Sequence, residues 1–453
     1  MNRLTLAIAL FLFPYFAHAA DPKTTMQQPA VAEALRFAQS NAEANIETQI
    51  HLCEIAAPEF HEEKRAAAVE ELFKAAHLQN IHTDPAGNLI GDRPGKNPHP
   101  HIVIAAHLDT VFPEGTDVHV TRNGNVLKGP GIYDDCRGLA ALVGVAQALD
   151  AGKVQTTGAI TFVADTGEEG LGDLRGMKEF FRDKSIFPGV SCRASASMGV
   201  FRNENAAAHH FRDTEQQGKC SKSKSDIDAF ISIDGPEPIT DAITGGVGSY
   251  RLRLTYSGPG GHSFNAFGIA NPIHALGRAI AKIDEIQTPE TPRTTFNVGR
   301  IGGGTSVNTI SSSAFAEIDM RSEESGALET TKAAVERAAQ SALDEENARW
   351  HDHGKLTMKI DLLGYRPTGS TPSNSMLVDT VRGVNQAMGL SALTTSRQST
   401  DSNFPMSLGI PSITLGAGGT GKDAHTVNET IDITDAWKGV QRLVLAVSTL
   451  AGW

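Results

Sequence analysis

Hydrophobic residues follow two different patterns along this chain, and the pattern changes near residue 245. Before that point, Ile102–Ala106, Ala159–Ala164 and Ala229–Ile233 are almost entirely apolar, which is typical of strands buried on both faces of a sheet. The apolar periodicity predicts helices over 31–51, 62–76 and 138–149. Strands that alternate with helices in this way indicate an α/β domain with an open sheet.

After residue 245, Tyr250–Tyr256 alternates between apolar and polar residues, as a half-exposed antiparallel strand does. Further strands are predicted over 296–301, 314–320 and 356–362, and helices over 272–286 and 328–349. This β-α-β-β-α-β order is typical of the split βαβ, ferredoxin-like arrangement. The residues after about 374 return to α/β character.

The two patterns predict one domain inserted into another. We expect a mixed-sheet α/β domain whose first part spans 30–245 and whose second part spans 364–453. A ferredoxin-like α+β domain would occupy 246–363 between them. Residues 183–228 have little periodicity and are expected to form an irregular insertion, which is unusual at this length in a compact domain.

The composition is that of an ordinary globular protein and narrows the classes of partner. The chain has 453 residues, of which 40% are hydrophobic and 20% are charged, and its formal net charge is −12. Nucleic acids and anionic membranes both attract basic surfaces, and the sequence contains no extended basic run. We therefore expect neither of these partners for the mature protein.

The first 19 residues have the features of a signal peptide. Arg3 precedes an apolar run from Leu4 to Phe16, and Ala17-His18-Ala19 offers small residues for cleavage. The run is short for a bilayer-spanning helix, although an uncleaved anchor is the alternative. The sequence predicts export, with the mature protein in the periplasm or secreted.

Export permits disulfides, and four cysteines are available. Cys192 and Cys220 flank one loop-like segment and are the pair that we favour, although four cysteines allow three pairings. Cys136 follows an acidic pair and is expected to be a buried free thiol.

Several short segments carry the side chains that two neighbouring divalent cations require. Three of them, His107-Leu108-Asp109, Glu168-Glu169 and Asp234, directly follow or closely follow predicted buried strands. The other two are Asp134-Asp135 in a Gly/Pro-rich turn and His425 in a glycine-rich loop. Open α/β sheets place their sites beyond the carboxyl ends of strands. Two metals about 4 Å apart need a bridging carboxylate with further oxygen and imidazole ligands.

Each segment also has a simpler explanation. His107 could be an ordinary surface histidine, Asp134-Asp135 a helix cap, Glu168-Glu169 a solvated turn, and Asp234 a turn residue. If the segments form a metal site, His107 would bind a metal and Asp109 would fix the tautomer of the His107 ring, because alternate residues of an extended segment share a face. Of Glu168 and Glu169, one would be a ligand and the other a general base.

The predicted inserted domain also presents polar side chains on turns and strand ends. His262, Asn308 and Arg321 are suited to donate to an oxyanion, bind a backbone amide and anchor a carboxylate, respectively. For Arg321, a structural ion pair with Glu323 is the alternative.

In the order H-x-D, D-D, E-E, D, H, with an inserted domain before the last element, these segments resemble the M20 family of metallopeptidases. The resemblance implies that Asp134 bridges two zinc ions, with His107 and Asp234 on one ion and Glu169 and His425 on the other. It further implies that Glu168 is the general base, that Asp109 orients His107, and that His262 stabilises the tetrahedral intermediate, often from a partner subunit. Asn308 and Arg321 match the family's substrate-binding positions, and the inserted domain would act as a lid or form a homodimer.

The resemblance predicts an exported zinc exopeptidase that hydrolyses short peptides, with two Zn²⁺ per chain. Co²⁺ or Mn²⁺ would also accept these ligands. An N-acyl-amino-acid deacylase with the same metal centre is the alternative, and a non-catalytic binding protein is less favoured because it has no need for the extra carboxylate of Glu168. The 183–228 segment departs from the family pattern, because it separates Glu169 from Asp234 by more residues than that pattern implies.

Overall fold

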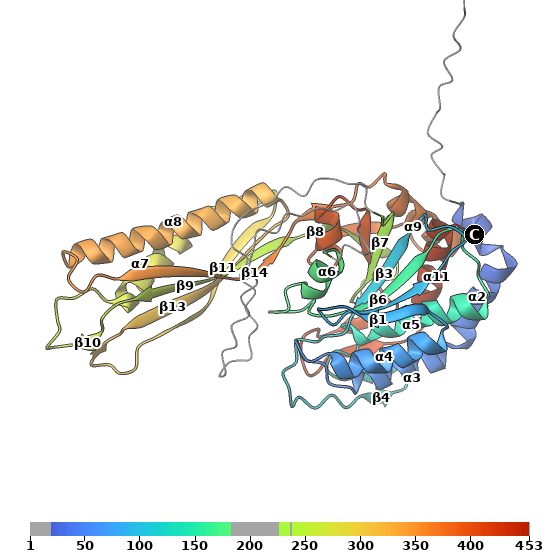
Figure 1. Cartoon of the computed structure of the whole chain (residues 1–453), viewed down its shortest axis with the longest axis horizontal. Helices are drawn as coiled ribbons and strands as arrows, with labels where there is room; N and C mark the ends of the chain where they lie inside the picture. The colour runs from blue at the N-terminus through green and yellow to red at the C-terminus, as the bar shows by residue number, and fades with distance from the viewer. Residues whose placement is uncertain (1–19, 183–225, 236–237, 453) are drawn as a thin grey trace, which may run out of the picture.

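The computed structural model describes residues 20–182, 226–235 and 238–452. The signal peptide predicted for 1–19, most of the predicted 183–228 insertion, and both Cys192 and Cys220 lie outside these residues. Figure 1 shows a large α/β unit from which a second, elongated unit projects to one side.

The large unit is built on a nine-stranded mixed sheet. Its strands lie in the order β1-β2-β6-β3-β7-β17-β8-β15, and β16 pairs with β8. Their bounds are β1 Gln79–Thr83, β2 Leu89–Arg93, β3 Ile102–His107, β6 Ile160–Asp165, β7 Ala229–Ile233, β8 Asp241–Gly246, β15 Gly369–Ser370, β16 Thr394–Gln398 and β17 Ser412–Leu415. Strands β6, β3, β7 and β17 are parallel, so their carboxyl ends meet at one edge of the sheet.

Helices cover both faces of this sheet, so its central strands are buried on both sides. Their bounds are α1 Pro22–Met26, α2 Pro29–Ser40, α3 Ala42–Cys53, α4 Glu63–Ala75, α5 Cys136–Ala151, α6 Arg175–Phe180, α9 Met376–Ala387, α10 Asn403–Ser407 and α11 Trp437–Ala451. One core joins alternate residues of β3 and β6 to α2, α4, α5, α9 and α11. The remaining side chains of these strands pack against α6 on the other face. The predicted α/β fold with an open mixed sheet is confirmed.

The single helix predicted over 31–51 is wrong, because two helices occupy this stretch. Helix α2 ends at Ser40 and α3 begins at Ala42. Asn41 between them has φ −97° and ψ 14°, outside the regular helical region. Serine and asparagine compete for backbone hydrogen bonds and weaken a helix interior, which explains a break that apolar periodicity does not reveal.

The projecting unit, which runs from β9 to β14 and is called the inserted unit below, has its own antiparallel sheet and core. The sheet order is β11-β13-β9-β14, and α7 and α8 pack on it. The bounds are β9 Gly248–Ser257, β10 Gly261–His262, α7 Pro272–Asp284, β11 Thr294–Gly303, β12 Thr309–Ile310, β13 Ser313–Ser322, α8 Ser325–Arg349 and β14 Thr357–Arg366. This order of elements and strands is the ferredoxin-like arrangement that the sequence predicts.

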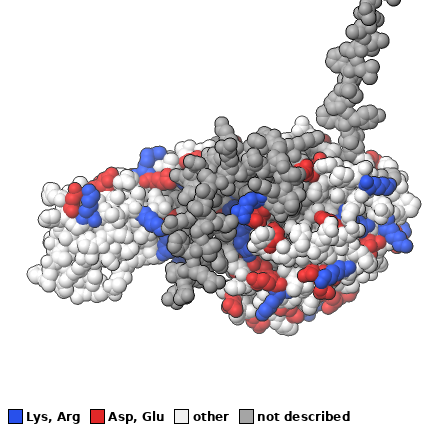
Figure 2. Space-filling model, viewed as in Figure 1, with Lys and Arg blue, Asp and Glu red and all other residues white. Residues whose placement is uncertain are grey.

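Apolar side chains are exposed at the end of the inserted unit that lies farthest from the large unit, around β10 (Figure 1). Phe264 is 85% exposed, Phe267 78% and Val307 102%. Figure 2 shows few charged residues on the visible face of this unit. Apolar surface of this kind is unusual in a monomer when it forms a patch, and it often marks a contact surface.

A small sheet joins two distant parts of the large unit. Its order is β18-β19-β5-β4, with bounds β4 Thr121–Asn123, β5 Val126–Lys128, β18 Thr420–Lys422 and β19 Thr430–Asp432. Because β19 pairs with β5, the loop that contains Asp134 is brought beside the loop that contains His425. These short, mostly exposed strands have no clear apolar pattern in the sequence.

A disulfide joins Cys53 to Cys136, so the prediction of a free thiol at Cys136 is wrong. Cys53 is the last residue of α3 and Cys136 is the first residue of α5, and their Cα atoms are 5.4 Å apart. This proximity arises from the packing of α3 on α5, across a sequence separation of 83, and could not be read from spacing.

Replacing both cysteines of this disulfide with serine is expected to lower the free energy of unfolding by about 2–5 kcal/mol, because the unfolded chain loses a constraint on a long loop. Denaturant unfolding of the variant and the oxidised wild type measures the difference. Reduced wild-type protein should unfold like the variant. Equal midpoints for oxidised wild type and variant would contradict the prediction.

None of the helices within the described ranges is both long enough and apolar enough to span a membrane.

Candidate metal centre

His107 lies at the carboxyl end of β3 and is fully buried. Its Nδ1 is 3.0 Å from the backbone carbonyl oxygen of Asp109, which can only accept a hydrogen bond. Nδ1 therefore carries a proton, and Nε2, which faces Asp134 at 3.2 Å, is the nitrogen that would bind a metal.

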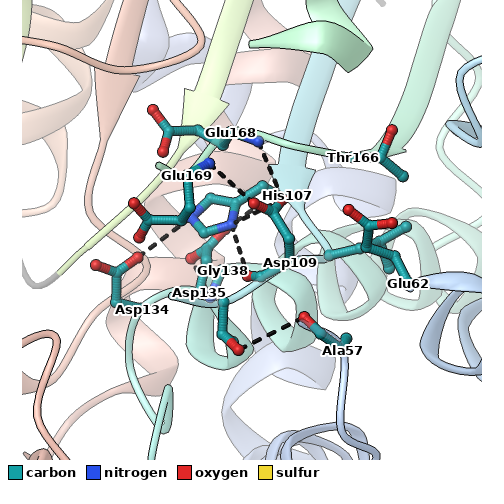
Figure 3. Close-up of polar contacts among 12 residues, drawn as sticks. Ala57, Glu62, His107, Asp109, Asp134, Asp135, Gly138, Thr166, Glu168 and Glu169 are labelled. Carbon is teal, nitrogen blue, oxygen red and sulfur yellow. Dashed lines mark hydrogen bonds and ion pairs between the residues drawn. The ribbon is translucent and has the colours of Figure 1, made fainter. Parts of the chain in front are cut away.

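The Asp109 carboxylate faces both the His107 ring and the turn of the two glutamates. It lies 3.7 Å from His107 Nδ1, beyond a good hydrogen bond. Its two oxygens accept hydrogen bonds from the backbone N–H groups of Glu168, at 3.0 Å, and Glu169, at 2.8 Å. The backbone of Asp109 orients His107, while its side chain holds the turn of the two glutamates (Figure 3).

Asp134 and Asp135 point in different directions. Asp135 is the N-cap of α5, and its carboxylate accepts the N–H groups of Gly138 at 3.0 Å and His107 at 3.1 Å. The two carboxylate oxygens of Asp134 face two histidines: Oδ1 lies 3.2 Å from His107 Nε2, and Oδ2 lies 3.0 Å from His425 Nε2. One carboxylate between two imidazoles is the arrangement that a metal-bridging ligand requires.

Glu169 completes the cluster. Its Oε1 is 2.9 Å from His425 Nε2, and one ligand atom each from His107, Asp134 and Glu169 lie within 4.8 Å of one another. Figure 3 shows the Glu169 carboxylate turned toward Asp134. Four of the five predicted metal ligands are thus brought together from β3, the loop before α5, the turn after β6 and the glycine-rich loop.

Asp234, the fifth predicted ligand, follows β7 and is half-buried. Its backbone N–H donates to the carbonyl oxygen of Leu415 at 3.2 Å, which fixes it at the same edge of the sheet. Its carboxyl group is outside the tight group above, although burial and the negative charge of Asp134 raise its pKa well above the usual range.

The electrostatics of the cluster favour bound cations. Burial raises the pKa of Glu169 to about 7, and hydrogen bonds that His425 donates to Asp134 and Glu169 raise the pKa of His425 to about 11. Burial opposes ionisation of Asp134, but its two histidine partners hold its pKa below the ordinary value. Without metal, the acids and histidines balance their charges with protons. Divalent cations would take that role, and the mixed carboxylate and imidazole donors fit zinc.

Zinc binding is therefore expected to release protons at pH 7, since ligands with raised pKa values must lose their protons to coordinate. Calorimetric titrations of metal-free protein in buffers of different ionisation enthalpy measure the number released. Affinity should fall as the pH is lowered from 7 to 5.5. A binding enthalpy that is the same in every buffer would contradict this expectation.

Glu168 is buried beside the cluster but makes its contacts elsewhere. Its Oε1 lies 2.8 Å from Nη1 of Arg366, which is also buried, and its backbone carbonyl accepts Nη2 of the same guanidinium. The turn needs Gly170, whose φ is +42° and where a Cβ would lie 1.9 Å from a Glu59 oxygen. The sequence did not predict Arg366 as a residue of this site, because nothing in its local sequence distinguishes it from other arginines.

Glu429 was also missed. It is fully buried, and its Oε1 accepts the N–H groups of Tyr133 at 3.0 Å and Asp134 at 3.2 Å. Burial raises its pKa to about 7. Glu429 thus fixes the loop that contains Asp134. It lies four residues after His425 in the same loop, and an acidic residue so close to a predicted ligand was the feature of the sequence that could have indicated it.

Two of the predicted residues of the inserted unit, His262 and Asn308, lie away from the cluster within this chain. His262 in β10 is exposed and pairs with Thr309 of β12, beside Asn308. Figure 1 places β10 at the far end of the inserted unit. His262 Nδ1 accepts the N–H of Phe264 at 3.2 Å, which leaves Nε2 as a donor when the ring is neutral.

Arg321 lies near the opposite end of the inserted unit, at the second-last position of β13 in the four-stranded sheet. Its Nε is 2.9 Å from Asp319 Oδ2, so Asp319, rather than the Glu323 considered from sequence, is its ion-pair partner. Its side chain remains 43% exposed.

Comparison with known proteins gives a family match over most of the chain. Residues 103–449 match the model of "Peptidase family M20/M25/M40". That range includes all the predicted metal ligands, Glu168 and the inserted unit.

Individual relatives are distant in sequence but similar in fold. An N-carbamoyl-L-amino acid amidohydrolase from Geobacillus stearothermophilus is 25% identical over 308 residues, which cover 64% of this chain and 69% of the relative. The structure of a tripeptidase from Staphylococcus aureus superposes with a TM-score of 0.69 at 20% identity, covering 91% of this chain and 99% of that chain. A dinuclear metal-binding M20 peptidase from Bacillus subtilis has a TM-score of 0.61 at 16% identity, with coverage of 91% and 99%.

Proposed function

Because this chain belongs to peptidase family M20/M25/M40, an amide-hydrolysing metalloenzyme family, we propose that it is an exported, zinc-dependent exopeptidase acting on short peptides. The observation that carries the proposal is the placement of Asp134 between His107 and His425, with Glu169 alongside. A buried carboxylate, Glu168, lies next to this group and is paired with Arg366.

The chain's residues divide into ligands and a proton carrier. Asp134 would lie between two zinc ions, with His107 and Asp234 holding one and Glu169 and His425 holding the other. Bound there, the ions would polarise the scissile carbonyl and acidify a water molecule. Glu168 takes the proton from the attacking water and returns it to the departing amine, since the base of the first step is the acid of the next.

The inserted unit supplies the remaining substrate contacts in this proposal. His262 donates a hydrogen bond to the developing oxyanion, while Asn308 and Arg321 hold the substrate backbone and its carboxylate. His262 lies at the end of the unit remote from the cluster, so it must come from a homodimer partner or through a large closure. The exposed Phe264 and Phe267 beside it favour the dimer.

A second function is favoured by one observation. The relative named an N-carbamoyl-L-amino acid amidohydrolase matches 64% of this chain at 25% identity. Hydrolysis of an N-acyl or N-carbamoyl amino acid would use the same metal ligands and Glu168, with a different pocket for the acyl group.

Purified mature protein tests both functions in one experiment. Elemental analysis should find two zinc ions per chain, and cleavage should stop after chelation and return after metal is added. A panel of dipeptides, tripeptides, N-acetyl and N-carbamoyl amino acids then separates exopeptidase from deacylase. Absence of turnover on the whole panel with metal bound would overturn both. Amino-terminal sequencing of protein from the exporting cell should begin near Ala20 if residues 1–19 are removed.

A further inference from the structure

Arg366 lies where the inserted unit joins the large unit. It is the last residue of β14 and pairs in register with Ser249 of β9. Just beyond it, Gly369 of β15 pairs with Gly246 of β8, in the main sheet. The two chain connections between the units therefore run side by side, and Arg366 is part of one of them (Figure 1). Any rotation of the inserted unit must bend the backbone at this point.

The guanidinium of Arg366 donates two hydrogen bonds to Glu168. Nη1 is 2.8 Å from the carboxylate oxygen Oε1, and Nη2 donates to the backbone carbonyl of the same residue. Each of the two side chains is only 6% exposed. Nη1 also donates to the Ser399 hydroxyl at 3.1 Å. A buried, charge-assisted contact of this kind fixes the carboxylate far more firmly than an exposed pair would.

Two further contacts bind the same turn to the inserted unit. Arg251 of β9 donates to the carbonyl oxygen of Gly170, and the N–H of Tyr365 in β14 donates to Asp173 Oδ2 at 2.7 Å. The segment from Glu168 to Asp173, which contains a metal ligand and the proposed base, is thus held from one side by three residues of the inserted unit.

We propose that Arg366 is a positioning residue that holds the carboxylate of Glu168 and makes its placement depend on the orientation of the inserted unit. This inference rests on the proposed function, because it gives Arg366 a role only through a catalytic Glu168. Figure 3 shows the Glu168 carboxylate turned away from that of Asp134 in this structure. A shift of the inserted unit would move Arg366 and, with it, the carboxylate that it holds.

A structural ion pair is the competing explanation, and kinetics separates the two. For Arg366→Gln we expect kcat to fall by about 10–100-fold, part of the 10²–10⁴ that positioned proton transfer contributes. KM should stay within about threefold and zinc content should not change, because the side-chain partners of Arg366 are Glu168, Ser399 and Asp173, none of which is a predicted metal ligand. Arg366→Lys, which keeps the charge but not the planar pair of donors, should recover part of the lost kcat.

The decisive comparison adds Arg366→Gln to Glu168→Gln. If Arg366 acts through Glu168, the double variant should lose no more than about threefold beyond Glu168→Gln alone. Arg300→Gln is the matched control, since Arg300 is an exposed arginine paired with Glu317 in the inserted sheet. A kcat for Arg366→Gln within threefold of wild type, or a full additional loss in the double variant, would overturn the inference. If Arg366→Gln does not fold, Arg366→Lys is compared in the same way.

Hydrogen exchange provides a readout that does not depend on turnover. Amides of the peptide covering 166–173 should exchange at least about tenfold faster in Arg366→Gln, and unchanged in Arg300→Gln, because the Glu168 carbonyl loses its donor. Unchanged exchange would overturn the inference even in an active enzyme. If the wild type turns over none of the substrates, the proposed function fails, while this measurement still decides whether Arg366 holds the turn.

Discussion

Replacing Glu168 with glutamine is expected to lower kcat by about 10²–10⁴-fold while both zinc ions and substrate binding are retained. Glutamine has nearly the same shape as glutamate and can still accept a hydrogen bond from Arg366, but it cannot take a proton from water. The Glu168 carboxylate is paired with Arg366 rather than with His107, Asp134 or His425, so metal content should not change.

Elemental analysis and steady-state kinetics on the same preparation measure both effects. Glu179→Gln is a suitable control, because this glutamate lies in α6 after the same turn and pairs with Arg182 at the surface. A Glu168→Gln enzyme that keeps more than a tenth of wild-type kcat would exclude Glu168 as the general base. Loss of zinc from the variant would instead make Glu168 a ligand.

Replacing Asp134 with alanine is expected to weaken metal binding more than about 100-fold and to abolish measurable turnover. This loss exceeds the roughly 10–100-fold that is typical when a residue hydrogen-bonded to a metal ligand is replaced. The reason is geometric: each carboxylate oxygen of Asp134 faces a different histidine, so its removal affects both ion positions. The neighbouring Asp135 cap of α5 stays in place, so the fold should be retained.

Zinc titration followed by competition with a chelator measures the affinity, and circular dichroism checks the fold. Asp432→Asn, an exposed acid in the small sheet near the centre, serves as control and should bind two ions normally. An Asp134→Ala protein that still binds two ions tightly would show that Asp134 is not the bridge. The cluster would then need a different assignment of ligands.

The sequence was informative where a residue's role follows from its own segment. Continuous apolar runs identified β3, β6 and β7, and the polar residues that follow these strands had to lie at one edge of a parallel sheet. The family resemblance, now confirmed, came from the order and types of those residues. The ferredoxin-like order of the inserted unit was likewise predictable, because the four strands of its main sheet and its two helices are long.

Contacts between distant segments were not predictable. The Cys53–Cys136 disulfide depends on helix packing, and the grip of Arg366 on Glu168 joins residues 198 positions apart. Asp109 has contacts that the sequence did not predict, because its carboxylate also accepts hydrogen bonds from the N–H groups of Glu168 and Glu169. Short exposed strands such as β5 and β19 gave no pattern, yet their pairing brings the Asp134 and His425 loops together.

By itself, the sequence determined the family, the α/β architecture with its inserted unit, and the chemical inventory of the metal centre. These depend on residue type and on local periodicity, which the chain carries in one dimension. Only the tertiary structure decided which atoms meet: that Asp134 lies between two histidines, that Glu429 fixes the backbone of Asp134, and that Arg366 holds Glu168. Those choices are made by packing among segments far apart in sequence, where burial and complementary charge select one arrangement from many.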